Sequence, residues 1–296
     1  MTKIEIPPLE EFIVYEKFYG VLFGDKNILK YYSREDNKVY ELARASSSIW
    51  SILADVKGEV YFGTYGTNNV HSLFNGFKLS KNGYVCSMVR YKDKILDTGE
   101  YGLEKTLSSE VLISVNDMEK RNIKEIENLF TNKNHNLYAL VWNKNETFSI
   151  ITLPKNYRKY SLGEEILHYD VRHLSICQAI AVPGELKGLN GKTYPFSIIS
   201  CVNLKYLDIN GKKVKRSGVG KGMEIKNLSY LSPSLNKIEL IYAGVNLNEI
   251  IKVEIEDGKV KNKKTLIPGL SNYVLTLEPV FNKNLHKKLV AKGRGK

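Results

Sequence analysis

The chain has 296 residues, 43% hydrophobic and 26% charged, which is typical of a globular protein with a sizeable core. No stretch approaches the ~18 uninterrupted apolar residues of a membrane-spanning helix, and the first residues, MTKIEIPPLEEF, lack the apolar run of a signal peptide. The net charge of +12 favours acidic partners such as nucleic acid, an anionic surface or an acidic protein, although a solvated lysine-rich surface would give the same value.

Residue usage bears on the cellular compartment. The three cysteines, Cys86, Cys177 and Cys201, are widely spaced in apolar stretches, so they form neither a disulfide framework nor a zinc pattern and are expected to be buried thiols. This favours a reducing compartment, and we expect a soluble cytoplasmic protein. Abundant lysine and glutamate with a single glutamine suits a thermophile, whereas the many asparagines argue against one, and an AT-rich genome would explain the abundant lysine, isoleucine, asparagine and tyrosine together. We expect a thermophilic archaeon or a virus of one as the source, and a viral protein would belong to the virion.

Strand signals dominate the chain. Short segments rich in apolar, β-branched or aromatic residues predict strands at 12–15, 19–23, 60–64, 84–89, 137–142, 148–153, 196–202, 238–242 and 250–255. None of them has the sustained period of apolar residues that a helix needs. Only residues 116–130, with interleaved acids and bases, predict a helical turn or two. The expected fold class is therefore all-β.

Asparagine–glycine and aspartate–glycine pairs predict hairpin turns, because these residues tolerate the positive φ of a two-residue turn. The pairs are Asn75-Gly76, Asn82-Gly83, Asn190-Gly191, Asn210-Gly211 and Asp257-Gly258. The last two follow similar segments and precede lysine-rich strands, which indicates one outer hairpin made twice. Asp36-Asn37 is a candidate third copy.

One phrase of the sequence nearly repeats itself. Residues 49–66 read IWSILADVKGEVYFGTYG and residues 85–102 read VCSMVRYKDKILDTGEYG, a constant offset of 36 residues without a gap. Gly63 matches Gly99, and Tyr65 matches Tyr101. A fixed period of tens of residues indicates one supersecondary unit copied along the chain.

The copied unit predicts a β-propeller. A small antiparallel sheet cannot bury both of its faces alone, and radial stacking buries them against each other. At roughly 40–50 residues per four-stranded blade, the chain holds about six blades, with five or seven as alternatives. Inner strands are expected to start near Phe12, Ile49, Val85, Ile126, Leu174 and Ile225. A strand at 273–277 would return to the first blade and close the ring, so that residues 1–281 form the propeller and 282–296 a basic tail. A pair of β-sandwiches is the structural rival, but sandwiches do not copy a unit.

The phrase GEVYFGTYG at residues 58–66 resembles the strand pair of β-propeller repeats, including those of sensor-protein and NHL-type propellers and of archaeal propeller proteins. The resemblance implies the fold alone, because propellers serve binding, scaffolding and catalysis. The tryptophan–aspartate dipeptide of WD40 repeats is absent, which argues against that subfamily.

Two segments resemble chemical motifs. Residues 217–222, SGVGKG, suggest a phosphate loop, but Lys215 stands where the motif needs glycine and Gly222 where it needs serine or threonine. The polar run 168–173 contains Asp170, Arg172 and His173, which suit ligand binding or acid–base work, or simply structural hydrogen bonds in a loop. No two histidines have helical metal-ligand spacing. We expect no metal and no cofactor.

Tyrosines supply the candidate binding platform. Tyr65 and Tyr101 occupy equivalent positions of the repeat, each just before a glycine, so they could line one face of the disc. Packing between blades would require the same repetition. Together with Asp170, Arg172 and His173 they are the predicted partner-binding residues.

Acidic and basic residues give two alternatives. Carboxylates at strand ends would support a glycoside hydrolase or lyase if two of them faced the central channel: Asp55, Asp97, Glu100, Asp170 and Glu278. The last residues would contact phosphates of nucleic acid, or an acidic partner, through Lys283, Lys287, Lys288, Lys292, Arg294 and Lys296, or would form a disordered solubilising end.

The main prediction is a non-catalytic scaffold that binds a protein partner or ligand on one disc face, within a larger assembly or alone. The alternatives are the hydrolase or lyase and a nucleic-acid-associated or virion structural protein held by the basic tail.

Overall fold

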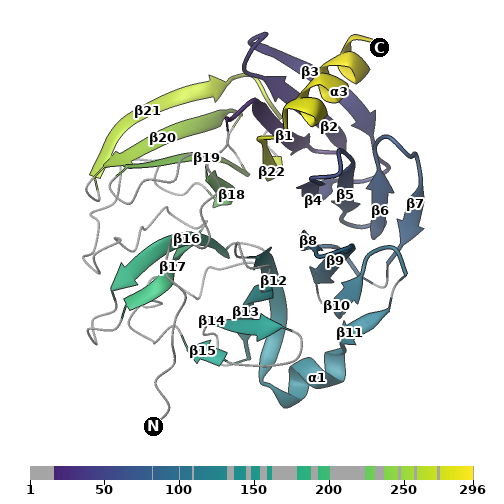
Figure 1. Ribbon diagram of the computed structural model, residues 1–296, viewed down its shortest axis with the longest axis vertical. Helices are drawn as coiled ribbons and strands as arrows, with labels where there is room; N and C mark the ends of the chain where they lie inside the picture. Colours follow the sequence, from purple (N-terminus) through teal and green to yellow (C-terminus); the bar gives the residue numbers. More distant parts are fainter. Residues whose placement is uncertain are drawn as a thin grey trace.

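The computed structural model describes residues 17–81, 83–99, 101–108, 110–131, 137–144, 148–153, 159–161, 179–187, 193–200, 224–230, 237–245, 248–256, 259–271 and 274–295. Within these ranges, antiparallel sheets are arranged around a common centre, and the last strand of the chain, β22 (Val274–Val280), is the innermost strand of the first sheet (Figure 1). Five of the described sheets have four strands and one has two. No helix in these ranges has the length and apolarity that crossing a bilayer requires.

The first three sheets carry the candidate sites. The first contains β22 (Val274–Val280), β1 (Gly20–Asp25), β2 (Ile28–Ser33) and β3 (Lys38–Arg44). The second contains β4 (Ile49–Ala54), β5 (Val60–Thr64), β6 (Asn69–Ser72) and β7 (Lys78–Ser80). The third contains β8 (Ser87–Tyr91), β9 (Lys94–Gly99), β10 (Gly102–Lys105) and β11 (Val111–Ile113).

The other sheets follow in chain order. They contain β12 (Ile123–Thr131), β13 (Leu137–Asn143), β14 (Phe148–Leu153) and β15 (Lys159–Ser161); β16 (Ala179–Lys187) and β17 (Thr193–Ser200); and β18 (Glu224–Tyr230), β19 (Lys237–Val245), β20 (Ile250–Glu256) and β21 (Lys259–Ile267). The described residues also form the helices α1 (Val115–Lys120), between β11 and β12, and α3 (Lys283–Arg294), after β22.

The first sheet is assembled from segments far apart in the sequence. Strand β22 pairs antiparallel with β1, with Gly20 opposite Val280 and Leu22 opposite Glu278. The expected return of a strand near residue 273 to the first blade is thus confirmed.

The repeated phrase forms the first two strands of successive sheets, and its glycines have a steric reason. A Cβ atom at Gly63 of β5 would lie 2.8 Å from the Cβ of Val85, which precedes the inner strand of the next sheet. A Cβ atom at Gly24 of β1 would lie 2.8 Å from the Cβ of Ile49 in the same way. Ile49 and Val85 are equivalent in the repeat. At these two interfaces a glycine of one sheet therefore leaves room for a branched side chain of the following sheet.

The cores lie between neighbouring sheets. One buried cluster joins the first and second sheets and includes Leu22, Leu29, Ile49 and Phe62. Another joins the second and third through Val70, Val85 and Met88, among others. Face-to-face burial between consecutive sheets is what the radial arrangement provides, because no single sheet is thick enough to have its own core.

Several local predictions are resolved. Asn75-Gly76 does turn the chain between β6 and β7, with Gly76 at φ 71°. Asn82 lies outside the described residues, but the strands before and after Asn82-Gly83, β7 and β8, belong to different sheets and do not pair as a hairpin. Of the predicted helical segment, residues 116–120 belong to α1 but residues 123–130 form β12, whose apolar residues pack in a buried cluster. Cys86 is a buried thiol, as expected, and it donates to Glu125 Oε1 at 3.0 Å.

Inner strands begin within five residues of the predicted starts at 49, 85, 126, 174 and 225. The start near Phe12 lies outside the described residues, as do Cys177, Cys201, Asn190-Gly191, Asn210-Gly211, Asp257-Gly258 and residues 217–222. The strands that flank Asp257-Gly258 do pair as a hairpin, with Glu256 opposite Lys259.

Candidate functional site

An exposed tyrosine stands at the end of the second sheet where β5 turns to β6. The side chain of Tyr65 is 45% exposed. Its ring centroid lies 4.6 Å from that of Trp50 and 5.4 Å from that of Tyr84, both of which are buried. Tilted aromatic contacts at these distances are favourable beyond the area they bury. Tyr65 is therefore an aromatic surface residue supported from below by two buried rings.

The turn that carries Tyr65 is held by hydrogen bonds. The Tyr65 backbone N–H donates to the carbonyl of Ser48 at 2.9 Å. The Thr67 hydroxyl lies 2.8 Å from that of Ser47 and 3.0 Å from that of Thr64. Gly66 takes φ 89°, which a side chain would strain. The turn that presents Tyr65 is thus held in place by hydrogen bonds within the chain.

Tyr101, the repeat equivalent of Tyr65, is not on the surface. Its side chain is buried, and its hydroxyl donates to Asp97 Oδ1. Burial first, and the negative charge of Asp97 second, raise the pKa of Tyr101 well above its ordinary value. The difference follows from the turns, since four residues join β5 to β6 but only two join β9 to β10, so Tyr101 turns inward. The other predicted binding residues, Asp170, Arg172 and His173, lie outside the described residues.

Two of the predicted acids, Asp55 and Asp97, are each paired with a basic side chain. Asp55 is buried and accepts two hydrogen bonds from the guanidinium of Arg90. Asp97 is buried beside Lys81, with 2.9 Å between Oδ2 and Nζ. Buried charges in proteins are normally paired in this way. Glu100 and Asp170 lie outside the described residues.

Glu278 is the one described acid with a strongly raised pKa. It keeps a small exposed surface, but it sits on the inner strand β22 with protein around it, and this desolvation raises its pKa to about 8. The N–H of Ala54, 3.3 Å from Oε1, opposes the rise. Among the described residues no cluster of histidine, cysteine or acidic side chains is suited to hold a metal.

The segment predicted as a tail is a docked helix over most of its length. Helix α3 begins at the cap Asn282, whose side chain accepts from the N–H groups of Asn284 and Leu285. Leu285 and Leu289 are buried against the first two sheets, in the cluster that includes Leu22. An asparagine cap followed by apolar residues four apart is the signal that predicts this helix. Residues 283–294 are therefore a helix rather than a disordered end, and Lys296 lies outside the described residues.

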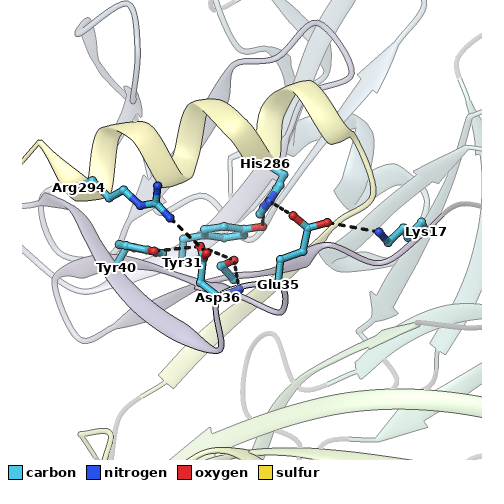
Figure 2. Close-up of polar contacts among 8 residues, drawn as sticks. Lys17, Tyr31, Glu35, Asp36, Tyr40, His286 and Arg294 are labelled. Atoms are coloured by element: carbon cyan, nitrogen blue, oxygen red, sulfur yellow. Dashed lines mark hydrogen bonds and ion pairs between the residues drawn. The ribbon is translucent and has the colours of Figure 1, made fainter.

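Polar contacts fasten α3 to the hairpin between β2 and β3 (Figure 2). His286 Nδ1 lies 2.8 Å from the hydroxyl of Tyr31, and Nε2 lies 3.1 Å from Glu35 Oε2. Lys17 also pairs with Glu35, at 3.3 Å, and a hydrogen bond from Lys17, followed by one from His286, lowers the pKa of Glu35. At the other end of the helix, Arg294 lies 3.2 Å from Asp36.

The outward side of α3 is strongly basic. We call Lys283, Lys287, Lys288, Lys292 and Arg294 the α3 basic surface. Lys288 and Lys292 lie 5.6 and 5.7 Å from the ring centroid of Phe74, and Lys288 also donates to the Gly58 carbonyl. Lys283 and Lys287 are exposed and have no acidic partner within the described part of the chain. The nearby acids, Glu35 and Asp36, are already engaged.

Comparison with known proteins defines the fold class. No protein-family model and no curated protein matches the sequence. The WD40 β-propeller domain of Doa1 matches with a TM-score of 0.51 and 14% identity over 92% of this chain and 93% of that one. Virginiamycin B lyase from Staphylococcus aureus matches with a TM-score of 0.44 and 10% identity, over 80% of this chain and 77% of that one. A chain of the mitotic checkpoint complex matches with a TM-score of 0.44 and 11% identity, over 95% of this chain and 95% of that one.

The protein therefore has a β-propeller fold, as the repeat predicts, although the WD dipeptide is absent. At these identities the likeness shows the fold alone. The blade number and the archaeal resemblance stay predictions.

Proposed function

We propose that this protein is a non-catalytic binding protein that recognises a protein partner through the surface around Tyr65. The observation that carries the proposal is an aromatic side chain, 45% exposed, resting on buried Trp50 and Tyr84. Tyrosine and tryptophan are enriched at protein interfaces, where they supply contact area at a low cost in conformational entropy. The fixed turn lowers that cost further.

The fold supports this proposal only in a general way. Propellers present loops on a rigid scaffold, and recognition residues usually lie on such loops. The WD40 domain of Doa1 shares the fold at a low identity. The proposal that the surface around Tyr65 binds a partner therefore rests on the position and packing of Tyr65 rather than on the fold.

The test is quantitative co-purification from the native source with three forms of the chain. Wild-type protein, Tyr65→Ser and Val56→Ser are used as baits, because Val56 is also an exposed apolar residue, 72% exposed, in the turn between β4 and β5. A central aromatic contact is worth about 2 kcal/mol or more, so we expect partner recovery to fall roughly 30-fold for Tyr65→Ser. Equal recovery with all three baits, at unchanged melting temperatures, would exclude the Tyr65 surface.

A second candidate function is nucleic-acid binding through the α3 basic surface. Five basic residues and no acid lie on α3, and two of the lysines have no acidic partner among the described residues. Such a surface binds phosphates by releasing counterions, with a strong dependence on salt and little on sequence.

Deleting residues 282–296 is a poor test, because it would also remove Leu285 and Leu289 from the core. The better variant is Lys283→Glu/Lys287→Glu, which leaves the buried face intact. We expect gel shifts with a single-stranded oligonucleotide to weaken with rising salt and to be lost in this variant. Oligonucleotide binding that is unchanged both by added salt and by the double substitution would refute the nucleic-acid role.

A further inference from the structure

A group of ionisable side chains is buried in the third sheet. The side chains of Lys81 and Asp97 are 0% exposed and that of Glu104 is 2% exposed. Lys81 lies just after β7, while Asp97 on β9 and Glu104 on β10 are directly opposite each other in the register of the sheet. Lysine is almost never fully buried, and here it meets two carboxylates away from water.

The distances place an amine against a carboxyl group. Lys81 Nζ is 2.9 Å from Asp97 Oδ2 and 3.2 Å from Glu104 Oε2. The contact with Glu104 has hydrogen-bond geometry, whereas Asp97 Oδ2 accepts no well-formed hydrogen bond from the described residues. Nζ is therefore directed at Glu104 and lies beside Asp97 rather than in line with its lone pairs. The carboxyl carbon, one bond beyond Oδ2, is roughly 3–4 Å from Nζ, close to the near-attack range.

We propose that Lys81 and Asp97 join spontaneously in an amide bond, an intramolecular isopeptide cross-link within the propeller. One proton of the Lys81 ammonium passes to Asp97 Oδ2, and the resulting amine attacks the carboxyl carbon. A second proton leaves the nitrogen and reaches the same oxygen, which departs as water. The third stays on the amide nitrogen. One C–N bond forms and one C–O bond breaks, and no oxidant or other reactant is required.

Two neighbouring side chains supply the groups that this reaction needs. Glu104, in hydrogen-bond contact with Nζ, accepts the second proton and delivers it to the departing oxygen, so it ends unchanged. The Tyr101 hydroxyl donates to Asp97 Oδ1, where negative charge develops in the tetrahedral intermediate. Because its pKa is raised well above the ordinary value, Tyr101 keeps its proton and remains a donor.

Burial and proximity favour the reaction. Fixed intramolecular partners react as if at effective concentrations of about 10⁵–10⁸ M. Loss of hydration weakens the preference for separated charges, so proton transfer within the pair costs less than it does in water. The product is a neutral amide whose N–H faces Glu104 and whose carbonyl faces Tyr101. It would fasten the connection between the second and third sheets to the middle of the third.

Intact mass spectrometry of the unfolded full chain tests the proposal directly. We expect the wild-type protein to be lighter than its sequence by the mass of one water molecule. Proteolysis should then give one branched peptide that joins the segments around Lys81 and Asp97. Wild-type protein at its full sequence mass after prolonged incubation, or a loss of water mapped to other residues, would overturn the proposal.

Variants test the roles within the cluster. Lys81→Met and Glu104→Gln should each have the full mass of their own sequence, whereas Lys78→Met, at an exposed lysine of β7, should be cross-linked like wild type. A cross-link at Lys81 that persists in Glu104→Gln would overturn the role of Glu104. The mass of the wild-type protein alone decides whether the cross-link exists, so this test remains valid even if a variant does not fold.

Discussion

The docking of α3 is best tested at Leu289, which is 0% exposed in the core between the first and second sheets. Leu289→Ala removes three carbon groups, and at ~0.8 kcal/mol for each this loses about 2.4 kcal/mol of transfer free energy. Incomplete collapse of the cavity raises the total to about 3–4 kcal/mol, within the range for buried leucines. We therefore expect the melting temperature to fall by about 5–6 °C, because the unfolding entropy of a chain of this length is about 0.6 kcal/mol/K.

The assay is urea and thermal unfolding of the full chain, with Lys287→Ala as the matched control. Lys287 lies on the exposed side of the same helix, so its replacement should change the free energy of unfolding by less than about 0.5 kcal/mol. If both variants unfold like wild type, α3 is not docked and the α3 basic surface is not fixed on the propeller.

Two further predictions concern packing and pH. Gly63→Ala should destabilise the protein by about 1–3 kcal/mol, because the new Cβ would lie 2.8 Å from the Cβ of Val85. Gly295→Ala is the control, because the nearest atom to its new Cβ would be 3.6 Å away, and it should not destabilise the protein. Equal losses of stability for the two variants in urea unfolding would contradict this reasoning. Folding raises the pKa of Glu278 from its ordinary value of 4.5 to about 8, so the folded state retains a proton that the unfolded state loses, and this residue makes stability fall as pH rises between those values. Glu278→Gln should therefore raise the melting temperature at pH 8 more than at pH 4.5; an equal change at both would count against the raised pKa.

The fold was predictable because its main determinant is local and repeated. The match of Ile49 with Val85 reports a steric requirement, because each packs against a glycine of the preceding sheet, Gly24 or Gly63. Strand positions followed from the same repeat, within a few residues. The error at Asn82-Gly83 arose because a sequence pair favours a turn without saying which strands it joins.

The sites were less predictable because they depend on partners distant in sequence. The repeat treats Tyr65 and Tyr101 alike, but the shorter turn after β9 buries Tyr101 against Asp97. Asp55 was a candidate acid until its pairing with Arg90 was seen, and no spacing rule connects these residues. The segment 282–296 was interpreted from its basic charge, and the spacing of Leu285 and Leu289, which predicts a helix with a buried face, was missed.

The pairing of β22 with β1 has a kinetic consequence. Gly20 pairs with Val280, which is 260 residues further along the chain. Closing so long a loop costs conformational entropy, so we expect this contact to form late in folding. Until it forms, β1 leaves an edge unpaired, and a second molecule could supply the missing strand. Exchange of this segment between molecules is thus the expected route to misassembly during refolding at high concentration.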